Sequence, residues 1–73
     1  MAYMKIIWNK MIPKERRLAF DTIVQGLQEA LTEPSNELAN QLTEEMTSIA
    51  RLHNLTVEEL EFARIAAVSE LQS

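Results

Sequence analysis

The run His53–Leu60, HNLTVEEL, constrains the fold most, because it contains the end of one helix and the start of the next without a spare residue. Asn54 is typical of the left-handed residue that ends a helix, and Leu55 after it can fold back onto the preceding turn. Thr56 and Glu59 have the spacing of a capping box, in which each side chain bonds the other residue's backbone amide. The run therefore predicts two helices joined through a very short corner.

The size of the chain predicts one domain with a thin stability margin. At 73 residues, folding buries only roughly 60% of the surface that the unfolded chain exposes. The sequence has no cysteine, so neither a disulfide framework nor a cysteine zinc site can support the fold. Association with a second copy would supply the missing core, and we expect a homo-oligomer, most simply a dimer.

Composition indicates an all-α fold and a soluble protein. Apolar residues make up 47% of the chain, and one glycine and two prolines leave few places for turns. No apolar run approaches the roughly 20 residues needed to span a bilayer, and no small-residue cleavage site follows an apolar block at the N-terminus. We expect no membrane span and a cytoplasmic location.

Apolar spacing predicts three helices in a single domain of residues 1–73. Pro13 suits the first turn of a helix over 13–31, and Pro34 separates it from a second helix that ends at His53. A third helix is expected over about 57–71. The sequence therefore predicts a small bundle of three helices with a short additional segment, residues 1–12, whose pattern fits a helix, a strand or a free arm. Its second and third helices meet at a corner of the helix-turn-helix kind.

The N-terminal segment concentrates positive charge. Residues 1–17 carry five basic side chains against Glu15 alone, and from residue 18 onward only Arg51 and Arg64 oppose ten carboxylates. Aromatic residues among cations can stack on bases or lie at a lipid surface. The candidate contacts for an anion or nucleic acid are Lys5, Trp8, Lys10, Lys14, Arg16 and Arg17. The same residues also fit a segment that docks on the core with a solvated basic side.

The third helix opens with an acidic turn that argues against reading DNA. A recognition helix places its first residues at base edges and phosphates, where carboxylates repel the backbone. One apolar arc covers nearly half the circumference of this helix, more than one small bundle can bury: Val57, Leu60, Ala63, Ile65, Ala67, Val68 and Leu71. Phe62 and Ala66 lie outside this arc, and Phe62 falls on the acidic side. We therefore take Phe62, Glu58, Glu59 and Glu61 as candidate contacts for a protein partner.

Catalytic and cofactor functions find no support in the sequence. His53 and Asp21 are the single residues of their types, and the glutamate clusters lack the Glu-x-x-His spacing of di-iron bundles and the ligand alternation of a calcium loop. One glycine cannot build a phosphate-cradling loop. We expect no catalytic residue, no metal and no cofactor. The sequence favours a non-catalytic protein–protein interaction or regulatory module that self-associates, with a nucleic-acid-binding regulator that uses the basic segment as the alternative.

Overall fold

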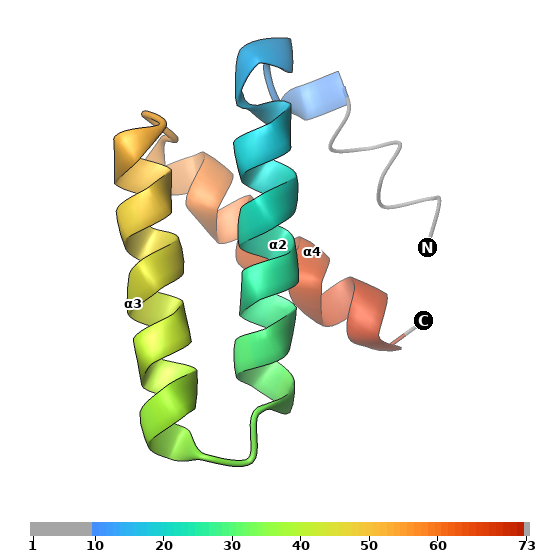
Figure 1. The fold of residues 1–73 in the computed structure, drawn as a ribbon. Helices are drawn as coiled ribbons and strands as arrows, with labels where there is room; N and C mark the ends of the chain where they lie inside the picture. The colour runs from blue at the N-terminus through green and yellow to red at the C-terminus, as the bar shows by residue number, and fades with distance from the viewer. Residues whose placement is uncertain (1–9, 73) are drawn as a thin grey trace.

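The computed structural model describes residues 10–72. Within that range the chain forms a short 3-10 helix, η1 (Lys14–Arg16), and three longer helices, α2 (Arg17–Thr32), α3 (Asn36–Leu52) and α4 (Val57–Gln72). α2 and α3 form an antiparallel hairpin, and α4 crosses one side of it (Figure 1). The predicted all-α bundle is confirmed, whereas most of segment 1–12 lies outside the described residues.

The helix boundaries follow from local chemistry. Arg16 donates its backbone N–H to the Pro13 carbonyl at 2.9 Å, which closes the short turn of η1 before α2 begins. Ser35 caps α3, because its hydroxyl accepts the Leu38 amide at 3.3 Å and so satisfies one of the helix's unpaired donors. Pro34 stands just before this cap, where its missing N–H has no helical bond to break.

The corner between α3 and α4 has the predicted geometry. Asn54 has a φ of 61°, the left-handed conformation. Its amide bonds the Arg51 carbonyl at 3.1 Å and the Leu55 amide bonds the Ala50 carbonyl at 2.9 Å, the pair of bonds that defines a Schellman motif. Thr56 and Glu59 then exchange side-chain to backbone hydrogen bonds of 2.9 and 3.0 Å, which completes the capping box.

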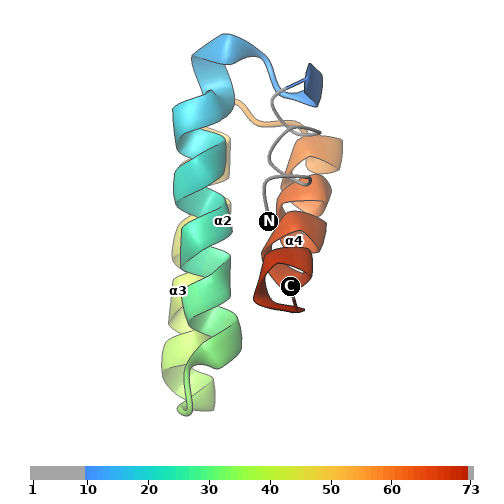
Figure 2. The same cartoon turned by 90° about the vertical axis from the view of Figure 1, so that its right-hand side faces the viewer.

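α2 is the central element of the fold, because it packs against both α3 and α4. Figure 2 shows the α2–α3 hairpin on one side and α4 on the other, so α4 covers only one face of the hairpin. The core is contributed mainly by α2 and is completed by small residues of α4. Its members are Ile12, Phe20, Ile23, Val24, Leu27, Met46, Ala50, Ala63, Ala66 and Ala67.

Gly26 marks a close approach between α2 and α3. A Cβ atom at this position would lie 2.1 Å from Sδ of Met46 and 2.8 Å from its Cγ, so the methionine occupies the space that a side chain would need. The small strip of Ala19, Gly26 and Ala30 is buried. The strip therefore serves the packing of α3 inside the same chain.

The buried face of α4 differs from the one that the spacing of its bulky residues predicts. Ala63, Ala66 and Ala67 are fully buried, although the apolar arc read from the sequence leaves Ala66 outside. Val68 and Leu71, which belong to that arc, are exposed. The alanines face the core because small side chains let α4 lie close to α2. The distance between packed helices depends on the side chains at the contact.

Candidate interaction surfaces

Arg16 and Glu59 tie the start of α2 to the corner. The guanidinium donates from Nε to Oε1 at 3.0 Å and from Nη2 to Oε2 at 2.6 Å, a two-bond pairing between residues far apart in sequence. Since Oε1 also accepts the Thr56 amide, one carboxylate serves both the capping box and the ion pair. The hydrogen bonds from Arg16 lower the pKa of the Glu59 carboxyl, against the opposing effect of partial burial.

This pairing divides the predicted basic contacts into two groups. Arg16 is held by Glu59, and Arg17 donates from Nε to the Ile12 carbonyl at 3.3 Å. Lys10 and Lys14 are exposed at the same end of the molecule. Lys5 and Trp8 lie outside the described residues. Contact of this end with an anion or nucleic acid stays a prediction, and within the described part the two exposed lysines are its best-placed donors.

The four residues of α4 that were predicted to contact a protein partner also differ in their surroundings. Phe62 is half-buried and packs against the core, with its ring centroid 5.7 Å from that of Phe20. Glu59 is engaged as described above. Glu58 and Glu61 are exposed. A partner can therefore reach these two carboxylates directly, whereas Phe62 acts first as a packing residue between α2 and α4.

The outward face of α4 carries the bulky apolar residues that the core does not use. Val57, Glu61, Arg64, Val68 and Leu71 recur at the spacing of one helix face. Val57, Ile65, Val68 and Leu71 are 42 to 81% exposed. Arg64 Nη1 lies 4.0 Å from Glu61 Oε1, so the two charges within the face offset each other. We call the six residues Val57, Glu61, Arg64, Ile65, Val68 and Leu71 the outer face of α4.

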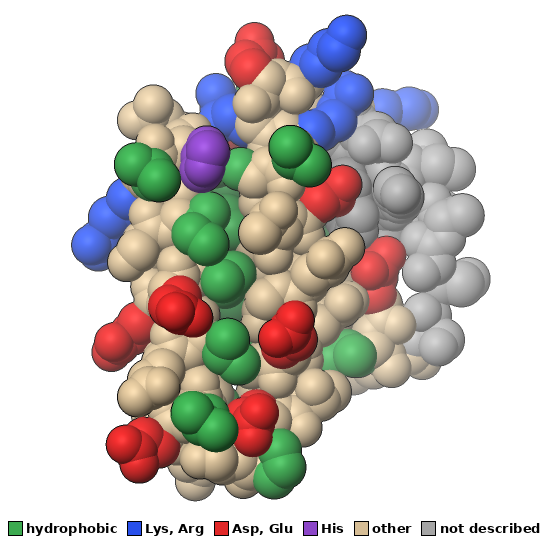
Figure 3. All heavy atoms as spheres, viewed as in Figure 1, with side chains coloured by type: hydrophobic (Ala, Val, Ile, Leu, Met, Phe, Trp, Pro, Cys, Tyr) green, Lys and Arg blue, Asp and Glu red, His purple; other side chains and the backbone are tan. Residues whose placement is uncertain are grey.

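A second apolar strip follows the line where α2 and α3 meet, on the side of the hairpin away from α4. Figure 3 shows hydrophobic side chains in a row along this line, with acidic groups beside it over the lower part. Leu18 of α2 and Ile49 of α3 line one groove there, together with Ala19 and His53. Leu38, Leu42 and Leu52 share a helix face with Ile49 by their spacing, and together with Leu18 and Ala19 they form the strip that we call the seam.

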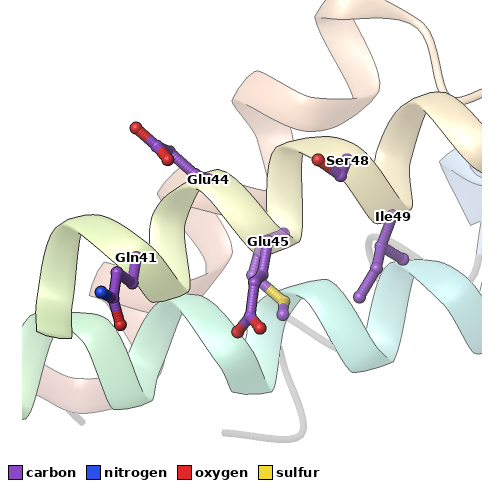
Figure 4. Close-up of a pocket in the computed structure, with 6 residues that line it drawn as sticks. Gln41, Glu44, Glu45, Ser48 and Ile49 are labelled. Carbon is purple, nitrogen blue, oxygen red and sulfur yellow. The ribbon is translucent and has the colours of Figure 1, made fainter.

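The described residues also form a hollow on the surface of α3. This hollow is lined by Gln41, Glu44, Glu45, Met46, Ser48 and Ile49. All six residues come from this one helix, and Glu44 points away from the side chains that face α2 (Figure 4). Residues 10–72 contain no group of three or more histidine or acidic side chains placed to hold a metal ion. In the same range no helix is long and apolar enough to cross a membrane.

The sequence predicted more apolar residues on α4 than one small bundle can bury, but it left Ala66, which the core buries, outside the apolar arc. The available signal was the run Ala63, Ala66 and Ala67, whose spacing marks a face of small residues opposite the bulky ones. Comparison of the chain with protein-family models, with curated proteins and with solved structures finds no match.

Proposed function

We propose that this protein is a non-catalytic interaction module that self-associates through the outer face of α4. The observation that carries the proposal is the reversed distribution of side chains on this helix: alanines face the core, and valine, isoleucine and leucine face outward. An apolar face of a helix is normally covered by another element, and α4 has apolar residues on two sides. The chain alone buries only one side of α4, and a second copy would cover the other.

The charges of the outer face support a second copy as the occupant. In a two-fold symmetric contact each residue meets the same surface on its partner, so any net charge would repel itself. The outer face contains one acidic and one basic residue, Glu61 and Arg64, 4.0 Å apart. If the two α4 helices run antiparallel, each arginine can approach the other copy's glutamate while the apolar residues pack along the axis.

The size of the domain supports the same proposal. A chain of 73 residues without disulfides has a small core, and α4 contributes to it mainly through three alanines. Full burial of a fully exposed valine or leucine contributes roughly 1.5 to 3 kcal/mol, and Val68 and Leu71, which are 42% and 45% exposed, would gain about half of that. Association through α4 would therefore add to the stability of the fold as well as create an interface.

The proposal is tested by the mass of the full-length protein in solution, measured by light scattering after size-exclusion chromatography over a range of concentrations. We expect a dimer that dissociates on dilution, and a monomer at all concentrations for Val68→Glu. Leu52→Glu is the matched control, because it places the same charge at an exposed apolar position on α3. A monomeric parent protein, or equal dissociation of both variants, would overturn the proposal.

A further inference from the structure

The seam is a second unpartnered surface, and it arises from the arrangement of the helices. α4 covers one face of the α2–α3 hairpin and leaves the other bare (Figure 2). α2 buries Met46 and Ala50 of α3 but leaves Leu42 and Ile49 half-buried. At the end of the seam near the corner, Leu18 and Leu52 are 80% and 76% exposed. The apolar stripe of α3 is thus wider than its contact with α2.

The shape of the seam fits a helix. It follows two antiparallel helices, and a third helix can lie in the groove between them with its side chains entering the gaps. A helix of 16 residues is about 24 Å long, so the hairpin offers a groove of about that length. Apolar anchors at every third or fourth position of a docking helix would meet Leu18, Ile49 and Leu42 in turn.

The charge around the seam indicates which kind of helix could bind there. Over the span of the seam, residues 18 to 52, the chain carries Asp21, Glu29, Glu33, Glu37, Glu44 and Glu45 against Arg51 as the single lysine or arginine. Figure 3 shows acidic side chains on both sides of the apolar row over its lower part. A second copy that used the seam would bring the same carboxylates against its own, whereas a cationic helix would find them complementary.

We propose that the seam binds an amphipathic helix of another protein, one whose apolar side carries leucine-like anchors and whose polar side carries lysine or arginine. The apolar side fills the groove beside Ile49 and Leu18, and the basic side chains reach carboxylates such as Glu45 of α3, whose side chain extends toward α2 in Figure 4. This surface is separate from the outer face of α4, which is charge-neutral, so the seam can bind its partner whether or not the protein self-associates.

The experiment uses the full-length protein and a fluorescent synthetic peptide of 14 residues, built from leucine and lysine with an amphipathic helical pattern, as the probe. An analogue with glutamate in place of lysine is the control peptide. Binding is measured by fluorescence anisotropy at two salt concentrations. We expect the lysine peptide to bind, more weakly at high salt, and the glutamate peptide not to bind.

Variants separate docking in the seam from diffuse attraction to an acidic protein. Leu18→Gln and Leu52→Gln should each weaken binding by about tenfold, the effect of removing one apolar anchor. Val57→Gln is the matched control: Val57 is equally exposed but lies on the outer face of α4, so this variant should bind within about twofold of the parent. Equal effects of all three variants, or none, would mean that the peptide is held by charge alone, and would overturn the proposal.

A second measurement excludes a second copy as the occupant. The mass in solution of Leu18→Gln and Leu52→Gln should equal that of the parent protein. If these variants dissociate a dimer that Val68→Glu leaves intact, the seam binds another copy and the proposed cationic partner is wrong. That outcome would also move the self-association from α4 to the hairpin, whereas failure of peptide binding alone would leave the α4 interface untouched.

Discussion

Replacing Gly26 with alanine tests how tightly α2 and α3 pack. Alanine in a helix interior is about 1 kcal/mol more favourable than glycine, so an unobstructed site would gain stability. At Gly26 the new Cβ would lie 2.1 Å from Met46 Sδ and 2.9 Å from its Cε, far inside the roughly 3.5 to 4.0 Å of a favourable contact. The whole methionine side chain must therefore leave its place.

The cost follows from the burial of Met46, which is 8% exposed. Losing the burial of a methionine costs roughly 1.5 to 3 kcal/mol, which exceeds the helical gain. We expect Gly26→Ala to destabilise the fold by about 1 kcal/mol net, which lowers the melting temperature by roughly 4 to 8 °C for a domain of this size. Circular dichroism at the helical minimum, followed during heating, measures the change.

A double-mutant cycle separates the steric cost from the helical gain. In a Met46→Ala background the obstructing atoms are gone, so adding Gly26→Ala should stabilise the protein by about 1 kcal/mol relative to Met46→Ala alone. The sign of the effect thus reverses between the two backgrounds. A higher melting temperature for Gly26→Ala in the parent sequence would refute the steric explanation, because it would mean that Met46 moves aside without loss.

Three further substitutions test the corner and the buried face of α4. Asn54→Gly should leave the melting temperature equal or higher, while Asn54→Val should lower stability by about 1 to 2 kcal/mol, because a β-branched residue resists a φ of 61°. Arg16 lowers the pKa of the Glu59 carboxyl. The stability that this pair contributes is therefore complete above the ordinary pKa of a glutamate and is lost as the pH falls through the lowered pKa of Glu59. A pH series of urea melts should show that Glu59→Gln loses part of this acid dependence. Ala66→Leu should destabilise by roughly 1 to 3 kcal/mol in a thermal melt, because the site is fully buried against α2 and has no room for added atoms; an unchanged melting temperature would mean that α4 packs loosely.

The helix ends at the corner could be predicted because the hydrogen bonds that define them are local. The left-handed residue, its two backbone bonds and the capping box all lie within the run from Ala50 to Leu60. The residue types there favour the conformations that they adopt, as Asn54 does by tolerating a positive φ. Local propensity and the final fold agree, and the structure confirms the geometry.

The packing of α4 was predicted only in part, because a pattern of helical spacing ranks bulky residues above small ones. Val68 and Leu71 dominate the apolar pattern, yet the close approach of α2 and α4 admits only residues such as Ala66 and Ala67. The Arg16–Glu59 pair was missed for a related reason: its partners are separated by 43 positions, and nothing in the spacing of either residue indicates the other. Both features depend on how helices meet, which a pattern along one helix does not contain.

The two proposed surfaces obey different electrostatic rules, and salt should therefore separate them. The outer face of α4 contains a mutually offset pair, Glu61 and Arg64, so screening removes little from an association driven by apolar burial. The lower part of the seam lies among carboxylates such as Glu45, and its attraction for a cationic helix acts through solvent, where the screening length falls from about 10 Å at 0.1 M to about 3 Å at 1 M salt. Raising salt over this range should release the lysine peptide from the seam while the dimer mass stays unchanged. If both associations weaken together, the outer face of α4 is held by charge, and its neutrality no longer favours a second copy as the occupant.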